Sequence, residues 1–335
     1  MSETSLAADL VLEGGGVLGI GHVGAISVLS EAGYTFPRVA GTSAGSIVGA
    51  LVAAGMPASR MTDIMTTVDY RRFADRSVLD RIPVGGPLLS LLTDDGVFEG
   101  EYLREWLGNL LVDECGVETF GDLAIEDDPH TSLPPERRYR LVVTATDITK
   151  GELRYFPWDY EPAYGLDPDR QLVADAVRAS MSIPFFYEPA TLTAADGTTS
   201  TLVDGGVLSN FPIDVLDRTD GQRPRWPTFG VKLLPVLPMD AAKLLPIAGL
   251  FKHGPVALAA NVAMTAIVGR DQAHLAKPWV KVRTMQVDTA GVNPVDFGLS
   301  QAQVATLFAN GRTAASRFLA AWDWEDYLDT YRTWE

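Results

Sequence analysis

The spacing of hydrophobic residues near the start of the chain predicts two strand-to-helix units in succession. Leu10 to Leu12 is a short apolar run that is typical of a strand, and three consecutive glycines follow it. Beyond the glycines, apolar residues recur at helical spacing up to Gly33, at Val17, Ile20, Val23, Ile26, Val28 and Leu29. A second strand closes at Val39-Ala40, and the helix that follows it has an apolar face with Ile47 and Leu51.

The same reasoning extends to the rest of the chain. Residues 139–147 form a continuous apolar and β-branched run, which is typical of a buried strand. Further strands are predicted over 153–156, 201–203, 229–236 and 280–287, and helices over 101–112, 172–180 and 300–322. No Pro/Gly/Ser-rich linker divides the 335 residues. We therefore expect one large α/β domain with insertions.

The glycines Gly14, Gly15 and Gly16 lie at the turn from the first strand into the first helix. Such a turn leaves several backbone N–H groups pointing towards one spot, and the positive end of the helix dipole reinforces it. The loop therefore favours a site for developing negative charge. The pattern Gly14-x-Gly16-x-x-Gly19 also matches a dinucleotide fingerprint, which requires an acidic residue at the end of the next strand. That strand ends in Gly-Thr-Ser-Ala-Gly instead, which argues against a dinucleotide.

The second turn carries a candidate nucleophile. Residues Gly41 to Gly45 fit the pattern Gly-x-Ser-x-Gly, in which small flanking residues let a serine lie on a strained strand-to-helix turn with its hydroxyl exposed. Ser43 follows Gly16 by about 27 residues, which is the length of one βαβ unit. Because parallel neighbouring strands end at the same sheet edge, we expect the glycine amides and the Ser43 hydroxyl to face one ester carbonyl.

A third short motif supplies a candidate base. The apolar run over 201–203 leads into Asp204-Gly205-Gly206. In isolation this is an ordinary Asp-Gly turn, but beside a glycine loop and a serine turn it makes Asp204 a candidate to accept the Ser43 proton. A carboxylate with a solution pKa of about 3.9 is a poor base at neutral pH. The hypothesis therefore predicts that Asp204 is buried and within hydrogen-bond reach of Ser43.

Composition and charge narrow the classes of partner. A hydrophobic share of 47% and a charged share of 21% are those of a soluble globular protein with an ample core. The 27 basic and 43 acidic residues give a net charge of −16, and no basic cluster occurs. This balance disfavours nucleic-acid binding and simple electrostatic adsorption to anionic lipid.

Cysteine usage and targeting signals bear on the compartment. Cys115 is the single cysteine, which excludes disulfides within the chain and zinc sites built from several cysteines. The N-terminus has no basic segment ahead of its first apolar run, so no signal peptide is apparent. The longest uncharged run late in the chain, over 254–269, is too short and too interrupted to span a bilayer comfortably. We therefore expect a cytoplasmic protein, with transient membrane contact as a further option.

The motifs and their order resemble a known family. EGGGVLG, GTSAG and DGG, in this order, resemble the three signature blocks of the patatin-like phospholipase family. The resemblance to bacterial members continues through GVFEGEYLREWL, VVTATDITKGEL, ASMSIPFFYEP and VDFGLSQAQ, and covers nearly the whole chain. It implies a three-layer α/β/α sandwich with a mainly parallel central sheet. It also implies a calcium-independent serine–aspartate lipid acyl hydrolase, of the phospholipase A, lysophospholipase or carboxylesterase type, without cofactor or metal.

The resemblance assigns roles by position. Ser43 becomes the acyl-accepting nucleophile and Asp204 its partner, and the oxyanion hole consists of the amides around Gly14, Gly15 and Gly16. Supporting motif positions are Gly19, Gly41, Gly45, Gly205 and Gly206. Leu18 departs from the family, which usually has a basic residue there. Amide donation needs no side chain, so acyl transfer survives this change, whereas neutral esters or lysolipids become better substrates than lipids with a phosphate head group.

Two other interpretations stay open. His253 and His274 follow Asp204, so the order Ser, Asp, His of an α/β-hydrolase triad is available. That fold places several strands ahead of its nucleophile, whereas only one or two fit before Ser43. Packing or a polar loop is the expected place of the other histidines, His22 and His130. A non-catalytic protein that binds lipid, an acyl carrier or a dinucleotide is the second alternative, although it has no chemical need of both serine and aspartate.

Residues 244–267 form the most apolar stretch of the chain. The stretch is either a core helix or an apolar cap that faces lipid, and core is favoured because apolar helices are usually buried. We expect a single catalytic domain over 1–335, with its core at about 8–216 and 228–322 and the possible cap at about 233–270. Because the chain is acidic, any membrane contact would rest on this apolar surface.

Overall fold

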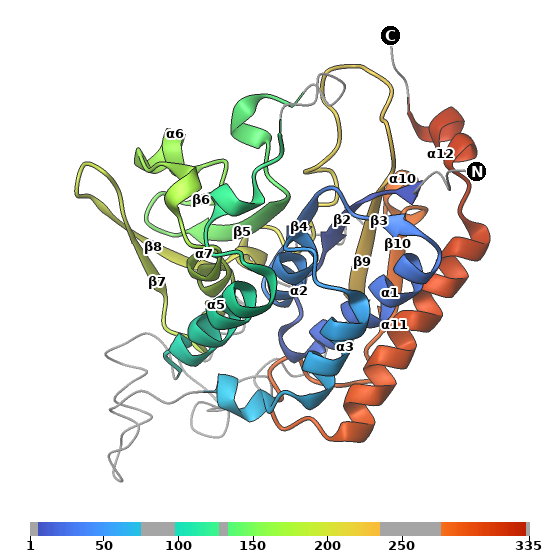
Figure 1. The fold of residues 1–335 in the computed structure, drawn as a ribbon, viewed down its shortest axis with the longest axis horizontal. Coiled ribbons are helices and arrows are strands. Elements are labelled where there is room, and N and C mark those ends of the chain that lie inside the picture. The colour runs from blue at the N-terminus through green and yellow to red at the C-terminus, as the bar shows by residue number, and fades with distance from the viewer. Residues whose placement is uncertain (1–5, 75–97, 127–132, 235–275, 333–335) are drawn as a thin grey trace.

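The computed structural model describes residues 6–74, 98–126, 133–234 and 276–332. Within these residues an eight-stranded sheet has the order β10-β9-β2-β4-β5-β8-β7, with β6 also paired to β5 (Figure 1). The parallel strands are β2 (Asp9–Leu12), β4 (Val39–Gly41), β5 (Leu141–Asp147), β9 (Thr228–Leu234) and β10 (Thr284–Asp288). The antiparallel strands are β6 (Glu152–Phe156), β7 (Ala190–Thr193) and β8 (Thr199–Asp204). A separate short pair joins β1 (Leu6–Ala7) to β3 (Tyr34–Thr35).

Helices connect and cover these strands. The longer ones are α1 (Ile20–Glu31), α2 (Ala44–Ala53), α3 (Ala58–Thr67), α5 (Glu101–Cys115), α7 (Val173–Ser180), α11 (Gln301–Ala321) and α12 (Trp324–Tyr331). Short helical turns are η1 (Gly16–Gly19), η2 (Tyr70–Phe73), η4 (Phe120–Leu123), η5 (Pro135–Arg137), α6 (Tyr160–Tyr164), η6 (Pro168–Arg170), η7 (Gly205–Val207) and α10 (Pro278–Lys281). The start of α11 follows from a capping box, in which Ser300 and Gln303 each accept a hydrogen bond from the backbone N–H of the other.

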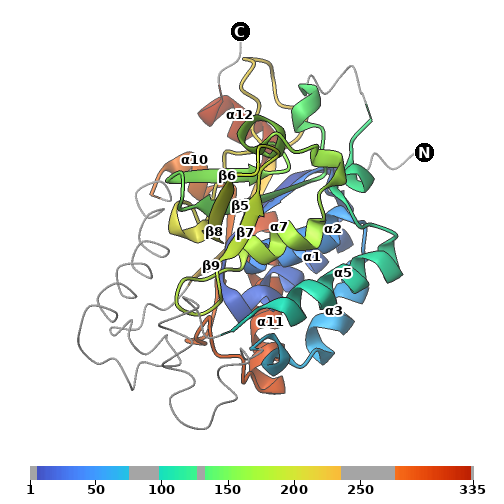
Figure 2. The same ribbon diagram turned by 90° about the vertical axis from the view of Figure 1, so that its left-hand side faces the viewer.

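The strands bury side chains on both faces of the sheet. On one face the strand residues form a large core with α1, α2, α3, α5, α7 and α11. On the other face Val11, Ala40 and Val142 pack against Phe211, Ile213, Leu216 and, in α10, Val280. Figure 2 shows α1, α2, α5 and α7 on one side of the strands and α10 on the other. The predicted three-layer α/β/α class with a mainly parallel sheet is thus confirmed.

One predicted strand was placed wrongly. Residues 280–287 were expected to be a strand, but the segment first forms the helical turn α10 and only then β10. Pro278 at the first position of α10 favours a helix start. In and just after this turn, Val280 is buried and Val282 is 37% exposed.

Several predictions fall on residues outside the described ranges. These are the position of His130 in a polar loop and the apolar stretch over 244–267 with most of the possible cap. His253 and His274 lie there as well, so the triad alternative has no described histidine to examine. Among the described helices, none has the length and apolar character needed to cross a bilayer.

Candidate active site

Ser43 lies at the sharp turn between β4 and α2. Its backbone has φ 51° and ψ −126°, a conformation that residues other than glycine rarely adopt. A β-carbon added to Gly41 would lie 2.4 Å from the Gly45 carbonyl oxygen, and one added to Gly45 would lie 2.2 Å from the Leu12 carbonyl oxygen. The glycines on both sides of the serine are therefore a steric requirement. A hydrogen bond of 2.8 Å from the Ser43 N–H to Ser180 Oγ helps to hold the strained turn.

The glycine loop passes directly beside this serine. It follows β2 and leads through η1 into α1, and a β-carbon added to Gly14 would lie 3.0 Å from the Ser43 β-carbon. The Gly14 N–H donates to the Asn210 carbonyl at 3.3 Å, and Asn210 Nδ2 donates to the Gly14 carbonyl at 3.2 Å. In the described part of the chain no hydrogen bond engages the amides of Gly15 and Gly16. The Gly14 amide is thus turned to Asn210, whereas the amides of Gly15 and Gly16 stay open as candidate donors of the predicted oxyanion hole.

The strand register brings Asp204 to the level of Ser43. Gly41 of β4 pairs with Val143 of β5, and Ala145 of β5 pairs with Asp204 at the end of β8. Two residues beyond Gly41, the serine therefore reaches the level of Ala145 and its partner. The Asp204 N–H also donates to the Ser182 carbonyl at 2.8 Å, which anchors this end of β8. The strand order thus brings together two residues that the sequence separates widely.

The Asp204 carboxyl group is buried, with 2% of the residue exposed. Burial raises its pKa to about 6, although hydrogen bonds from the Ser43 side chain and from the Gly206 N–H, at 2.7 Å, act in the opposite direction. The Ser43 hydroxyl also lies 3.4 Å from Met181 Sδ. Since a thioether is a weak acceptor, the carboxylate is the stronger of the two partners for the serine proton.

Ser43, Asp204 and the three glycines line one small cavity of ≈ 60 Å³. Leu18 lines it as well, and so do Glu13 and Lys232, which form a buried ion pair. Sequence reasoning did not find this pair. The signal for it was a single lysine inside the otherwise apolar strand β9, where a charge needs a buried partner.

A second, apolar cavity adjoins the first. It has a volume of ≈ 20 Å³ and shares Gly16 with the cavity around Ser43. Ala44, next to the serine, and Met181, which contacts the serine hydroxyl, form its near end. The other walls come from α2, α3, η2, α5 and two loops, with Ile47, Met65, Tyr70, Phe73, Leu103, Trp106, Tyr187 and Phe297. The arrangement places an apolar space beside the Ser43 hydroxyl.

His22 has a packing role, as the sequence predicted. It is fully buried in α1, and its Nε2 donates to the Glu13 carbonyl at 2.8 Å. Burial lowers its pKa to about 4, although this hydrogen bond opposes the shift, so the ring is neutral at pH 7. His22 does not line the cavity around Ser43. Of the two carboxyl groups among its described lining residues, Glu13 pairs with Lys232, and Asp204 accepts the hydrogen bond from Ser43.

Comparison with known proteins identifies the family. Residues 10–217, more than half of the chain, match the family described as patatin-like phospholipase, and this range includes both Ser43 and Asp204. The chain belongs to this family. Membership of the patatin-like phospholipase family makes hydrolysis of lipid esters the class of activity that the comparison supports.

The chain is also similar to individual proteins and to a solved structure. YqhO of Bacillus subtilis is 34% identical over 316 residues, which are 94% of this chain and 98% of YqhO. Lysophospholipase nte1 of Aspergillus fumigatus is 30% identical over 215 residues, which are 62% of this chain but only 11% of that longer protein. The crystal structure of VipD from Legionella pneumophila shares the fold, with a TM-score of 0.53 at 20% identity over 93% of this chain and 66% of VipD.

Proposed function

We propose that this chain is a serine lipid acyl hydrolase, built as a single catalytic domain, in which Ser43 is the nucleophile and Asp204 its base. The observation that carries the proposal is the burial of the Asp204 carboxyl group against the hydroxyl of a serine held at φ 51°. Strained backbone at a strand-to-helix turn is typical of a nucleophile. A carboxyl group with a raised pKa beside it is typical of a general base.

The proposed reaction has two steps. Ser43 Oγ attacks the ester carbonyl while Asp204 accepts the serine proton, and the alcohol of the lipid leaves after it receives a proton from Asp204. Water then attacks the acyl-enzyme, with Asp204 again as the base, which releases the fatty acid. In both steps the amides of Gly15 and Gly16 stabilise the tetrahedral oxyanion. The loss of one such donor is expected to lower the rate by about 10²–10³-fold.

A direct serine–aspartate pair is favoured over a triad with histidine. In a triad the aspartate bonds to the histidine, and the histidine takes the serine proton. Here the aspartate itself accepts a hydrogen bond from the serine. With a pKa of about 6, Asp204 is mostly ionised at pH 7 and is still a far better proton acceptor than an ordinary carboxylate.

The apolar cavity beside Ser43 is the proposed place of the acyl chain of the substrate. Its walls are apolar, and it begins at Ala44 and Met181, which are the neighbours of the reacting hydroxyl. A volume of ≈ 20 Å³ is too narrow for a chain of several methylenes. Met65 and Met181 have flexible side chains that can turn aside to widen it. We therefore expect esters with an apolar acyl chain as substrates, and transient contact with the lipid surface that holds them.

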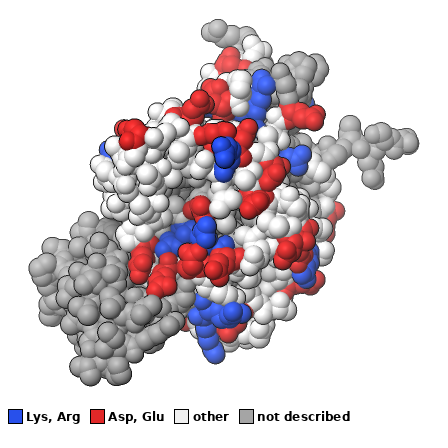
Figure 3. Space-filling model, turned by 60° about the vertical axis from the view of Figure 1, so that its left-hand side comes forward, with Lys and Arg blue, Asp and Glu red and all other residues white. Residues whose placement is uncertain are grey.

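The charges around Ser43 favour neutral or zwitterionic head groups. Lys232 is the cationic side chain that lines the cavity, and Glu13 already neutralises it, while Leu18 stands where the family usually has a cation. With Asp204 ionised, the cavity carries no surplus of positive charge for a phosphate. On the face in Figure 3, Lys and Arg lie among Asp and Glu and form no continuous basic surface. Lysolipids and neutral esters fit this site better than anionic phospholipids, in line with the name of the fungal relative.

The deciding experiment is covalent labelling by a fluorophosphonate, followed by mapping of the modified residue. We expect a single label on Ser43, no label on Ser43→Ala, and no hydrolysis of a short-chain nitrophenyl ester by either Ser43→Ala or Asp204→Asn with the fold intact. Lysolipid hydrolysis by the wild type then tests the substrate class. A label on another residue, or full activity of Asp204→Asn together with a loss in His253→Ala or His274→Ala, would contradict the proposal.

A further inference from the structure

A second pocket lies at the edge of the sheet opposite to Ser43. Ser43 and the glycine loop follow the carboxyl ends of β4 and β2, whereas this pocket is lined by residues at the amino ends of the same strands. Its volume of ≈ 430 Å³ falls in the range of small-molecule sites, about 300–1,000 Å³. Since a strand rises about 3.3 Å per residue, the seven residues of β9 put roughly 20 Å between the two edges. The pocket is therefore separate from the candidate active site.

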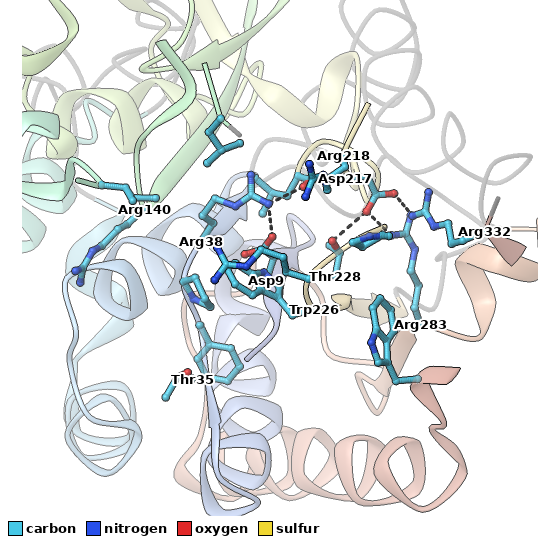
Figure 4. Close-up of a pocket in the computed structure, with 18 of the residues that line it drawn as sticks. Asp9, Thr35, Arg38, Arg140, Asp217, Arg218, Trp226, Thr228, Arg283 and Arg332 are labelled. Atoms are coloured by element: carbon cyan, nitrogen blue, oxygen red, sulfur yellow. Dashed lines mark hydrogen bonds and ion pairs between the residues drawn. The ribbon is translucent and has the colours of Figure 1, made fainter. Parts of the chain in front are cut away.

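The strand order places polar side chains in a row along this edge. Taken across the sheet from β10 to β5, the strands begin at, or directly after, Arg283, Thr228, Asp9, Arg38 and Arg140. Figure 4 shows these side chains around one hollow. Three arginines that are far apart in the sequence thus lie at one edge of the sheet. Two of them, Arg38 and Arg140, directly precede the neighbouring parallel strands β4 and β5.

The pocket carries a surplus of positive charge. Six arginines line it, namely Arg38, Arg140, Arg218, Arg225, Arg283 and Arg332, together with the acids Asp9 and Asp217. Two of these arginines also pair with acids from outside the lining, Arg283 with Asp214 and Arg218 with Asp220. The lining itself thus holds six cations and two anions. In a chain with a net charge of −16, such a concentration of arginine calls for an explanation.

Part of the charge holds the fold together. Asp217 accepts hydrogen bonds from Arg283 Nη1 at 2.7 Å and from the Thr228 hydroxyl at 3.0 Å, and it pairs with Arg332 just beyond α12 (Figure 4). In the same way Arg38 pairs with Asp9 and donates to the Leu216 carbonyl at 2.8 Å. These contacts attach the C-terminal segment and the loop around Asp217 to the sheet.

Two features exceed what such a network requires. Arg140 is exposed at the pocket and forms no ion pair with any residue in the described ranges. The Nε of Arg283 is buried, in a side chain that is only 1% exposed, and it has no hydrogen-bond partner among the described groups. A buried donor without a partner costs free energy unless a ligand or water satisfies it. A purely structural ion-pair network also has no need of an open hollow beside it.

Aromatic residues form a further part of the pocket lining, beside aliphatic residues such as Ile125, Leu133 and Leu216. Phe36, Trp226, Trp324 and Tyr327 line it, and the Arg225 guanidinium lies 4.6 Å from the centre of the Trp226 ring. Trp226 and Trp324 are only partly buried, so ring surface is left for a bound group. Planar rings stack on such surfaces, while arginine presents paired donors that match the oxygens of a phosphate.

We propose that this pocket binds a phosphate monoester of an aromatic or heteroaromatic group, of about the size of a mononucleotide. The arginines along the sheet edge hold the phosphate, and the ring lies against the tryptophans. An inorganic anion would leave the aromatic wall uncovered, and an uncharged ring would leave the positive charge unmatched. A ligand that has both a phosphate and an aromatic ring would contact the arginines and the aromatic residues together.

Calorimetric titration of the full chain with AMP, phenyl phosphate and inorganic phosphate tests this assignment. We expect one equivalent of AMP or phenyl phosphate to bind at least about tenfold more tightly than inorganic phosphate. Ser43→Ala should bind as the wild type does, since the site is remote from the serine. If neither aromatic phosphate binds, or if inorganic phosphate binds equally well, the proposal is wrong.

Variants locate the binding. Arg140→Glu and Arg225→Glu reverse exposed charges at the pocket and should each weaken binding by about tenfold or more. Arg317→Glu, which changes an exposed arginine of α11 that does not line the pocket, should leave binding unchanged. Trp226→Leu removes the ring but keeps an apolar side chain, so it should weaken AMP and leave inorganic phosphate as before. If Arg317→Glu and Arg140→Glu weakened binding equally, the effect would come from the overall charge of the protein and not from this pocket, and the assignment would be wrong.

Discussion

The Asp204 carboxyl group is buried against the Ser43 hydroxyl, so the group proposed to take the serine proton is itself held where ionisation is costly. Burial raises the pKa of Asp204 to about 6, and only the ionised form can act as a base. We therefore expect kcat/KM to rise with a single ionisation whose midpoint is near pH 6 and to level off above about pH 7. A pH-stat assay of fatty-acid release measures this directly.

Two outcomes would contradict this assignment of the pH profile. A midpoint near pH 4 would mean that Asp204 has the pKa of an ordinary exposed carboxyl group. A midpoint that moves when His253 or His274 is replaced by alanine would assign the ionisation to a histidine. Asp63→Asn, which removes an exposed carboxylate of α3 that does not line the cavity around Ser43, serves as the control, since it should keep the step near pH 6.

The same buried charge should make Asp204→Asn more stable than the wild type at alkaline pH. The pKa of Asp204 is higher in the folded state than in the unfolded state, so the folded state binds the proton more tightly. The stability that this proton contributes is lost as the pH rises from about 4 through about 6. The pKa of Asp204 rises from 3.8 in the unfolded chain to about 6 in the folded protein. At about 1.4 kcal/mol per pKa unit, the neutral amide of Asp204→Asn should therefore add up to about 3 kcal/mol to the free energy of unfolding above pH 7. Urea unfolding at pH 8 and at pH 4.5 measures this difference.

Controls isolate the contribution of Asp204. The gain should shrink towards pH 4, where the carboxyl group of the folded state is already protonated. His22, whose pKa is lowered to about 4, titrates in the same range, but it is present in both proteins and cancels in the difference. Asp63→Asn removes an exposed carboxylate from α3 and should change stability little at either pH. A less stable Asp204→Asn at pH 8 would mean that the ionised carboxylate is well solvated.

The ion pair between Glu13 and Lys232 allows a third prediction. Both side chains are buried, so Lys232→Met leaves the Glu13 carboxylate in the core without its counter-charge. We expect this variant to lose about 3–5 kcal/mol of unfolding free energy, and the double variant Glu13→Gln/Lys232→Met to recover much of the loss. Urea unfolding of the two variants measures both values.

An exposed pair provides the comparison for this prediction. Arg60 and Glu114 lie at the surface, where solvent screens their attraction, so Arg60→Met should change stability little. If Lys232→Met were as stable as the wild type, or if the double variant were less stable than the single one, the pair would not be coupled in the way that its burial implies.

The parts of the site that sequence could predict are those fixed locally. The glycines around Ser43 are demanded by a turn only five residues long, so the motif and its strained geometry go together. Periodicity likewise predicted the strand of 141–147 and the long helix after Ser300, because each is set by its own residues. Asp204 was predicted only in company with the other motifs, since an Asp-Gly turn by itself is common.

The parts that sequence could not predict depend on strand order. Lys232 meets Glu13 because β9 lies next to β2, although 219 positions separate the two residues. The carbonyl of Asn210, in the loop after η7, accepts a hydrogen bond from the Gly14 N–H, and no local sequence pattern predicts this contact. The row of arginines at the opposite edge has the same origin. Long-range pairing decides these contacts, whereas local periodicity reports only which segments form strands.

The position of Ile47 allows a test of where the acyl chain binds. Ile47 lies on α2, one turn beyond Ser43, and lines the apolar cavity. A larger ring in Ile47→Phe would occupy space that a long acyl chain needs, while an acetyl group would still fit beside the serine. We expect kcat/KM for long-chain nitrophenyl esters to fall about tenfold or more relative to that for the acetate. As a control, Ile64→Phe adds the same volume at a buried position of α3 outside the cavity, so it should cost similar stability, about 1–3 kcal/mol, without changing this ratio. An unchanged ratio in folded Ile47→Phe, or an equal change in both variants, would place the acyl chain elsewhere.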